Sequence, residues 1–384
     1  MKAVVVGGGV LGASAAWHLS RAGAEVVVLD PARQGRATAA GAGIICPWLS
    51  GVTDPEYNRL AFAAARFYPA LVAALAEDGE PATGYRRVGG MAVPHEGNLD
   101  AHEALVRQRT ADRPEAGAVS RLSPREARAL FPPLREGQEA LHVSGGARVD
   151  GRLLASALLA AAARHGADVR PVEATALHAE GGRVQGVATA DGGIAADVVV
   201  LAGGAWADDL LAPVDLRLGM APQRGQIVHL HLPGTATADW PVLLPMDSYY
   251  LLAFDDSRVV VGATRETGSG FDYRVTAGGL AEVLNAGLRV APGLAGATLG
   301  EVRVGFRPAG PGFRPLLGTA DIPGLVIGNG LGPGGLTLGP LAGRLLAQLA
   351  LGQAPEHDLQ PFALPRAAVP PMQFPRQVPS HDTS

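Results

Sequence analysis

A glycine-rich turn close to the N-terminus constrains the fold more than any other part of this sequence. An apolar run at residues 4–6 leads into Gly-x-Gly-x-x-Gly, formed by Gly7, Gly9 and Gly12, and a helix-forming segment at 13–22 follows. Gly7 permits a tight turn, Gly9 lets a pyrophosphate approach the helix N-terminus, and Gly12 lets helix and sheet pack closely. The order of these elements predicts a dinucleotide-binding strand–turn–helix.

The next strand supports the same interpretation. A second apolar run at 26–29 ends in Asp30, whose carboxylate is placed to accept hydrogen bonds from an adenosine ribose. The first motif therefore indicates an adenine dinucleotide, but it does not distinguish NAD from FAD.

Composition limits the class of protein. A chain of 384 residues favours two domains, and a net charge of −4 gives no indication of a nucleic-acid partner or of more than peripheral membrane contact. The longest apolar stretch, around 158–163, is far shorter than the ~20 residues that span a bilayer. The single cysteine, Cys46, excludes an internal disulfide and a cysteine-based metal cluster. The ten histidines lack metal-ligand spacing, so we expect no metal site. The short apolar stretches and the lone cysteine lead us to expect a cytoplasmic protein.

Hydrophobic patterns and turn residues predict the remaining elements. Helices are expected at 56–77, after a Ser123 cap, and at 151–165 (capped by Asp150), 277–290 and 336–351. Strands are expected at 90–93, 169–172, 175–178, 183–189, 197–201, 226–232, 249–254, 258–262, 301–307 and 324–328. The tail from 364 to 384 is proline-rich, and we expect it to be disordered.

A second glycine-rich strand–turn–helix lies near the other end of the chain, at 328–340. Its turn has almost no side chains, which suits a flat ring pressed against backbone amides at a helix N-terminus. Glycine turns at both ends favour FAD over NAD, because an NAD domain is usually completed in one continuous block. We therefore predict an α/β protein with a Rossmann-like, glutathione-reductase-like FAD-binding domain made from residues 1–80, 142–216 and 300–363. An α+β substrate domain built on an antiparallel sheet, from 81–141 and 217–299, is interleaved with it.

The chain resembles the FAD-dependent D-amino acid oxidase superfamily, in the branch of glycine oxidase, sarcosine oxidase and bacterial D-amino acid dehydrogenase. The similarity covers nearly all of the part expected to be ordered, and its motifs lie at 7–12 with Asp30, 38–44, 149–150, 200–206, 261–264, 305–308 and 330–340. The first motif is common to many flavoproteins, whereas the last three in this order are specific. Some relatives attach FAD through a cysteine in the C-terminal half; this chain has none there, so the resemblance implies non-covalent FAD.

The glycine turns and the resemblance together predict the cofactor-binding residues. These are Gly7, Gly9, Val10, Leu11, Gly12, Asp30, Pro31, Thr38, Ala39, Ala40, Gly41, Gly43, Ile44, Thr175, Ala202, Gly203, Trp206, Arg307, Gly330, Leu331, Gly332, Gly334, Gly335, Leu336 and Thr337. Residues 38–44 would wrap the pyrophosphate and the flavin edge, the backbone near Thr175 would meet adenine, and 330–337 would hold the flavin ring.

Oxidation of an amino acid to an imine needs a cation for the substrate carboxylate and a cavity over one flavin face. Arg307 matches the carboxylate-binding arginine of the family, and a planar guanidinium binds carboxylate with two hydrogen bonds. A buried structural ion pair is the alternative for Arg307, and it fits Arg303 equally. Tyr250, or its neighbour Tyr249, aligns with a tyrosine that contacts substrate, although a purely structural tyrosine is about equally compatible with the pattern.

The resulting hypothesis is oxidation of the C–N bond of an amino acid by hydride transfer to flavin N5, followed by imine hydrolysis to a 2-oxo acid. D-amino acids come first, and N-substituted glycines or D-proline-like imino acids second. Residues 331–334 lack the larger polar side chains of glycine oxidases, which counts against glycine and sarcosine and favours D-amino acid dehydrogenase-like chemistry on a larger or cyclic substrate. The electron acceptor is oxygen or a quinone-type molecule, and a homo-oligomer is left open. The alternatives are oxidation of a 2-hydroxy acid, or a flavin-bearing subunit of an amine dehydrogenase complex.

Overall fold

Both glycine turns lie at the carboxyl ends of strands in one six-stranded sheet. The computed structural model describes residues 1–94, 99–246, 249–365 and 369. The strand order is β19-β20-β13-β1-β2-β9, and all neighbours are parallel except β19 and β20. The strands are β1 (Lys2–Val6), β2 (Glu25–Leu29), β9 (Asp168–Arg170), β13 (Val198–Leu201), β19 (Leu316–Thr319) and β20 (Leu325–Asn329). They come from three separate stretches of chain, which confirms the predicted α/β class.

Side chains alternate between the two faces of this sheet. Ala3 and Val5 pack against four helices, whereas Val4 and Val6 pack against a small sheet and a short helix on the other face. The helices of the first face are α1 (Val10–Arg21), α3 (Pro55–Glu77), α6 (Gly151–Arg164) and α9 (Gly335–Ala350). The second face carries β10 (Ala174–Glu180), β11 (Arg183–Thr189), β12 (Gly192–Ala195) and α7 (Ala207–Leu211). The sheet is therefore covered on both faces.

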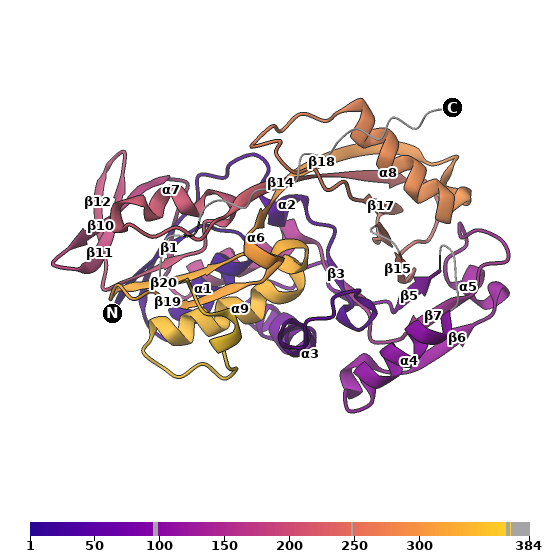
Figure 1. Ribbon diagram of the computed structural model, residues 1–384, viewed down its shortest axis with the longest axis horizontal. Helices are drawn as coiled ribbons and strands as arrows, with labels where there is room; N and C mark the ends of the chain where they lie inside the picture. Colours follow the sequence, from indigo (N-terminus) through magenta and orange to yellow (C-terminus); the bar gives the residue numbers. More distant parts are fainter. Residues whose placement is uncertain (95–98, 247–248, 366–368, 370–384) are drawn as a thin grey trace.

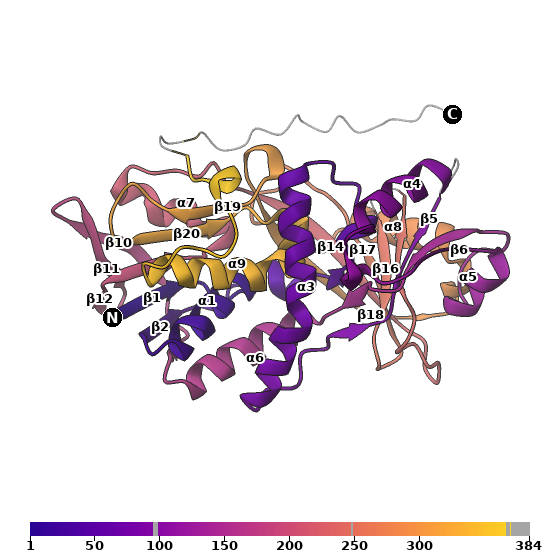
Figure 2. The same cartoon turned by 90° about the horizontal axis from the view of Figure 1, so that it is seen from below.

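Helix α3 crosses the molecule beside α9 (Figure 2). By length and composition alone it is the one described helix that could cross a membrane, with a mean hydropathy of 1.4 over 18 residues. Half of that window is buried, and the hydroxyl of Tyr68 donates to the carbonyl of Leu336 on α9. The burial accounts for its apolar composition as that of a core helix.

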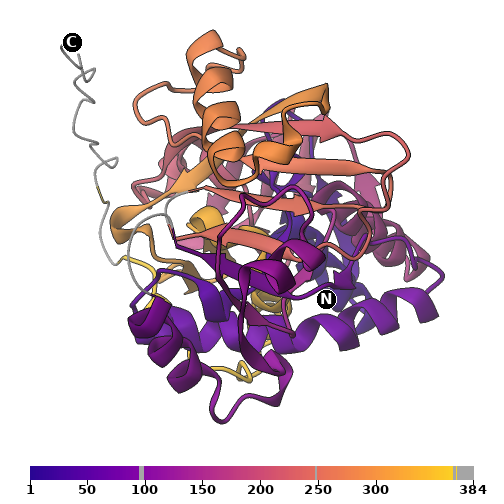
Figure 3. The same ribbon diagram turned by 90° about the vertical axis from the view of Figure 1, so that its right-hand side faces the viewer.

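A second, eight-stranded sheet has the order β18-β14-β17-β16-β15-β5-β7-β6, antiparallel except where β15 meets β5. Its strands are β5 (Gly90–Val93), β6 (Val119–Leu122), β7 (Ala140–Val143), β14 (Ala221–His231), β15 (Val242–Pro245), β16 (Tyr250–Ala253), β17 (Arg258–Gly262) and β18 (Thr298–Ala309). Helix α8 (Ala277–Val290) packs on one face (Figure 3). Helices α4 (Leu99–Thr110) and α5 (Pro124–Leu130) both contact β6 at the end of this sheet. A three-stranded sheet of β3 (Ile44–Ile45), β8 (Ala147–Arg148) and β4 (Arg86–Arg87) completes the fold, and α2 (Ala37–Ala40) precedes β3.

Long strands β14 and β18 run from the second sheet toward the first (Figure 1). Strand β18 pairs with β14 from Thr298 to Ala309, so the predicted domain boundary at residue 300 falls inside one continuous strand. The boundary at 142 likewise falls inside β7. These two long strands place residues of the second sheet next to the glycine turns.

Local sequence signals account for several element ends. Ser123 and Glu126 form a capping box at α5, and the Asp150 carboxylate accepts from two backbone amides at the start of α6, as predicted. The pattern did not predict α4, β6, β7, β15 or β19, and it began the first helix three residues late. The prediction for the tail concerns residues of which only 364, 365 and 369 are described, so it lies outside the described residues.

Candidate active site

A cavity of about 340 Å³ lies between the two sheets and contains most of the predicted site residues. Those that line it are Gly7, Gly9, Val10, Leu11, Asp30, Pro31, Thr38, Ala40, Gly41, Gly43, Ile44, Thr175, Ala202, Gly203, Trp206, Tyr250, Arg307, Leu331, Gly332, Gly335 and Leu336. Gly12, Ala39, Tyr249, Gly330, Gly334 and Thr337 are not among its lining residues. The volume is in the usual range for a small-molecule site.

The first glycine turn has no room for side chains. Gly7 has φ +104°, and a Cβ there would lie 2.5 Å from the carbonyl oxygen of Ala202. A Cβ on Gly12 would overlap the carbonyl oxygen of Gly7, so Gly12 serves close packing rather than lining the cavity. At the start of α1, the backbone amide of Val10 donates to Oγ1 of Thr38 (3.0 Å). The positive end of this helix faces the cavity and suits an anionic group.

Asp30 lines the cavity at the end of β2, as the ribose hypothesis requires. Its Oδ2 accepts from Nη1 of Arg36 (2.8 Å), and its Oδ1 accepts from the amide of Ala32 (3.0 Å). Gly8, which the sequence analysis passed over, also lines the cavity, and a Cβ there would lie 2.5 Å from Asp30 Oδ2. Arg36 is likewise a lining residue that carried no recognisable sequence signal.

The second glycine turn closes the opposite part of the cavity. Gly330 has φ +69°, and a Cβ there would lie 2.8 Å from the carbonyl oxygen of Arg314. Asn329, missed by the sequence analysis, donates from Nδ2 to the carbonyl of Gly204 (2.9 Å) and accepts from the amide of Gly330 (2.8 Å). This asparagine therefore ties the two turns together through the loop that follows β13.

Three predicted residues that do not line the cavity instead shape its wall. Thr337 donates from Oγ1 to the carbonyl of Ile44 (2.9 Å), which holds α9 against the 38–44 segment. The carbonyl of Ala39 accepts from Nε of Arg152 (3.0 Å). A Cβ on Gly334 would overlap the hydroxyl of Tyr57. These three residues thus contribute packing and backbone hydrogen bonds beside the cavity, and their contacts with a cofactor stay a prediction.

Arg307 and Tyr250 lie together on the wall formed by the eight-stranded sheet. Nη1 of Arg307 donates to the carbonyl of Thr264 (3.0 Å). Two glycines leave space for these side chains: a Cβ on Gly225 would lie 2.7 Å from both Nη atoms of Arg307, and one on Gly262 would lie 2.6 Å from Cζ of Tyr250. Burial raises the pKa of Tyr250, with opposition from Arg307, and burial lowers the pKa of the Arg307 guanidinium.

Tyr249 does not share this wall. Its hydroxyl interacts with Oε1 of Glu282 on α8 (2.9 Å), because neighbouring residues of an extended chain point to opposite faces. Of these two tyrosines, Tyr250 lines the cavity and Tyr249 does not. Arg303 also lies outside the cavity, and its Nε donates to Oε1 of Glu301 (2.7 Å). The alternative of a structural ion pair consequently applies to Arg303.

Arg265 is an exposed lining residue that the sequence analysis did not single out. It lines the same cavity as Arg307 and Tyr250, and its positive charge acts to lower the pKa of both groups. The neighbouring carboxylate, Glu266, is already bonded to Arg224, Gln226 and Thr264. The cavity thus presents two guanidinium groups beside one tyrosine.

Cys46, Trp48 and Met91 are buried residues outside the cavity lining. Cys46 is buried, and burial raises the pKa of its thiol to about 12, so it is not a nucleophile. Met91 and Trp48 are buried in the hydrophobic cores and do not line the cavity. Among the described residues, no group of three or more His, Cys, Asp or Glu side chains could hold a metal ion.

The donor set fits an adenine dinucleotide with a flat ring. The close turn and the α1 N-terminus suit a pyrophosphate, Asp30 suits a ribose, and the nearly bare turn before α9 suits a ring system. The part near Thr175 and Trp206 extends the same cavity toward β10. Which predicted residues touch the cofactor itself stays a prediction.

Comparisons with known proteins agree with this site. A family model described as "FAD dependent oxidoreductase" matches residues 2–349. YurR of Bacillus subtilis, described as an uncharacterised oxidoreductase, is 46% identical over 362 residues, covering 94% of this chain and 97% of that protein. Glycine oxidase of Pseudomonas aeruginosa is 33% identical over 368 residues, covering 94% and 98%. The crystal structure of iminodiacetate oxidase from Chelativorans sp. BNC1 matches with a TM-score of 0.92 and 52% identity, covering 94% of this chain and 98% of that one.

Proposed function

Because this chain belongs to the family of FAD-dependent oxidoreductases, we propose that it oxidises an N-substituted glycine that carries a second carboxylate, such as iminodiacetate. The carbon next to nitrogen loses a hydride and the nitrogen loses a proton, which forms a C=N bond. Water then splits this imine into glyoxylate and an amine, which for iminodiacetate is glycine. Bound FAD supplies the acceptor for the hydride.

Two of the arginines that line the cavity, Arg265 in the loop after β17 and Arg307 on β18, support this substrate class. Arg307 is held by the Thr264 carbonyl and would bind the carboxylate next to the reacting carbon. Arg265 lies nearby and would bind the carboxylate at the other end of the substrate. A substrate with two carboxylates can engage both guanidinium groups, whereas one with a single carboxylate engages only one of them. This observation moves N-substituted glycines, ranked second from the sequence, ahead of D-amino acids.

The chain's own groups would mainly orient the substrate. Two fixed ends place the central nitrogen and its neighbouring carbons in a defined position, and positioning supplies much of the rate enhancement in such reactions. Tyr250 offers a hydroxyl on the same wall, and its raised pKa keeps that hydroxyl protonated as a hydrogen-bond donor.

A substrate panel tests the proposal. The FAD-loaded protein is mixed without oxygen with iminodiacetate, sarcosine, glycine, D-alanine or glycolate, and loss of the flavin absorbance is followed. We expect iminodiacetate to reduce the flavin at a concentration roughly tenfold to a hundredfold below that needed for sarcosine. One hydrogen bond to a charged group contributes about 1.5–3 kcal/mol to the binding free energy. A preference for D-alanine or glycolate would contradict the proposal.

The second carboxylate anchor has its own variant. Arg265→Met should bring the KM for iminodiacetate close to that for sarcosine, whereas Arg274→Met, at an exposed arginine of the same loop, should not. Oxygen is the proposed electron acceptor, since both named relatives of known substrate are oxidases. Turnover with a quinone analogue but without oxygen uptake would overturn that part.

A further inference from the structure

The loop that carries Arg265 is fastened on both sides of that residue. It joins β17 to α8 and spans residues 263–276. On one side, Oγ1 of Thr264 accepts from the amide of Gln226 (2.9 Å). On the other, Glu266 and Arg224 exchange two backbone hydrogen bonds of 2.9 Å each. The backbone of Arg265 is therefore set against strand β14 before any side chain is considered.

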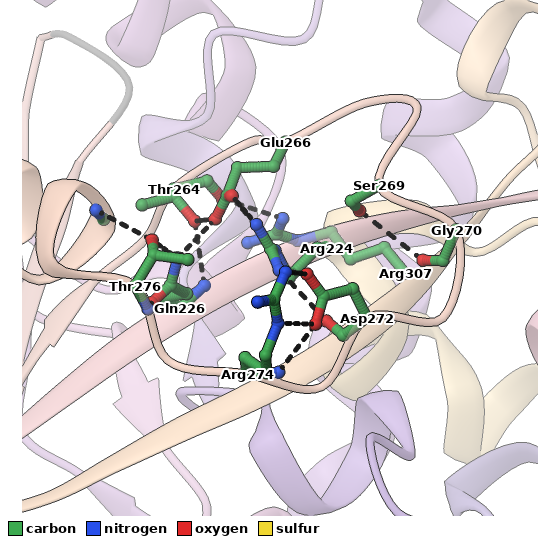
Figure 4. A network of polar contacts seen from close by, with 11 residues as sticks. Arg224, Gln226, Thr264, Glu266, Ser269, Gly270, Asp272, Arg274, Thr276 and Arg307 are labelled. Carbon is green, nitrogen blue, oxygen red and sulfur yellow. Dashed lines mark hydrogen bonds and ion pairs between the residues drawn. The ribbon is translucent and has the colours of Figure 1, made fainter.

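One buried cation, Arg224 of β14, then ties two acidic residues of the loop together. Its Nε donates to Oε2 of Glu266 (3.0 Å), and its Nη1 pairs with Oδ2 of Asp272 (2.8 Å) and donates to the carbonyl of Asp272 (3.2 Å). Figure 4 shows the guanidinium of Arg224 between the two carboxylates. The side chain of Arg224 is 8% exposed, so this cation is largely removed from water.

Gln226, two residues further along β14, anchors the far end of the loop. Its Nε2 donates to Oε1 of Glu266 (2.7 Å) and to Oγ1 of Thr276 (2.9 Å), and its Oε1 accepts from the amide of Thr276 (2.9 Å). Burial acts to raise the pKa of Glu266, but the hydrogen bonds from Arg224, Gln226 and Thr264 lower it overall. Glu266 is therefore ionised, and its carboxylate is hydrogen-bonded to these three residues rather than directed at a substrate.

The same loop reaches the cofactor side of the cavity. Phe271 stacks on Trp206 with ring centroids 4.9 Å apart and an interplanar angle of 11°, and its ring meets Phe306 edge-on at 5.3 Å. Asp272, the second partner of Arg224, directly follows Phe271. Loss of Arg224 would remove the buried charge that pairs with both loop carboxylates, and removal of one partner from such a pair is destabilising.

We propose that Arg224 is a positioning residue for substrate selectivity, which holds the 263–276 loop so that Arg265 faces the second carboxylate of the substrate. The inference rests on the proposed function, because it takes Arg265 as the second anchor. Arg224 acts through Glu266 and Asp272 and does not line the cavity. Replacement of Arg224 should therefore change how strongly the protein prefers ligands with two carboxylates over ligands with one.

The test uses the FAD-loaded protein and two ligands that cannot be oxidised at nitrogen. Oxydiacetate has two carboxylates and methoxyacetate has one, with an ether oxygen in place of the amine. Their dissociation constants are measured from the change in flavin absorbance. Arg224→Met should lower the preference for oxydiacetate roughly tenfold, the scale of one hydrogen-bonded charge, while kcat for iminodiacetate changes by less than about threefold. Arg224→Lys should restore part of the preference.

Arg274→Met is the matched control, because Arg274 also pairs with Asp272 but its side chain is 83% exposed. It should leave the preference unchanged. Should Arg224→Met not fold, Asp272→Asn removes one arm of the same tie and must lower the preference in the same direction. An unchanged preference in that variant would overturn the proposal.

Single variants and one double variant separate this inference from the proposed function. If Arg265→Met leaves the preference unchanged, the second anchor is wrong and the positioning role falls with it. If Arg265→Met lowers the preference but Arg224→Met and Asp272→Asn do not, the function stands and the positioning role is refuted. If Arg224→Met still lowers the preference in the Arg265→Met background, Arg224 does not act through Arg265, and the inference is also wrong.

Discussion

Replacement of Gly225 by alanine should displace Arg307 without removing its charge. Gly225 lies on β14, beside the β18 strand that carries Arg307. An added methyl group would lie 2.7 Å from both Nη atoms, whereas ordinary contact begins near 3.4 Å. The guanidinium must therefore move by about 0.7 Å or more. A carboxylate hydrogen bond of about 2.9 Å would stretch to about 3.6 Å, which is no longer a hydrogen bond.

The size of the effect follows from that lost bond. One hydrogen bond to a charged group contributes about 1.5–3 kcal/mol, so kcat/KM for iminodiacetate should fall roughly 10- to 150-fold. The free energy of unfolding should change by less than about 1 kcal/mol, because the strand keeps all of its backbone hydrogen bonds.

Steady-state kinetics on four variants would check the argument. Gly193→Ala on β12 is the control, because its added Cβ would come no closer than 4.0 Å to the described neighbours. In an Arg307→Met background, Gly225→Ala should lower kcat/KM little further, because the guanidinium that it displaces is gone. A Gly225→Ala enzyme with wild-type kcat/KM, or an equal loss in both backgrounds, would refute the reasoning.

Three further outcomes are expected. Gly12→Val should abolish FAD retention, measured by cofactor fluorescence after gel filtration, because even a Cβ there overlaps a backbone carbonyl; a fully loaded variant would contradict this. Ser123→Ala should cost about 1 kcal/mol in urea unfolding with unchanged kcat, since it removes the cap shared with Glu126; no loss of stability would count against it. Burial lowers the pKa of His18 and of His229 from 6.5 to about 3, so the unfolded chain binds protons in that window that the folded chain does not. The free energy of unfolding should therefore fall as the pH drops below 6.5, and a rise on acidification would disprove this.

The cofactor side of the site could be predicted because its constraints are local. At Gly7 and Gly12 any side chain would collide with backbone only a few residues away or in the adjacent strand, and such positions leave a regular glycine spacing. The resemblance extended this to Arg307, whose flanking motif is distinctive. Hydrophobic patterns and turn residues also predicted β17 and α8 with the bounds that the structure has.

The substrate side could not be predicted to the same depth. The position of Arg265 depends on contacts between a loop and a strand about 40 residues earlier, and no local spacing records them. The choice between Tyr249 and Tyr250 depends on which face of β16 meets the cavity, which the alternation alone leaves open. Helix α4 buries only Leu99, Val106 and Arg109 among its described side chains, too few for a clear periodic pattern.

The pairing of β1 with β13 has a consequence for how the chain acquires its cofactor during synthesis. The first turn leaves the ribosome early, yet the Ala202 carbonyl that bounds Gly7 follows only after β13 is made, and the turn at Gly330 later still. At about 5–20 residues per second, some 15–65 s separate the two turns. A nascent chain therefore has no complete dinucleotide cradle for most of its translation. FAD should consequently bind near or after the end of synthesis rather than during most of elongation.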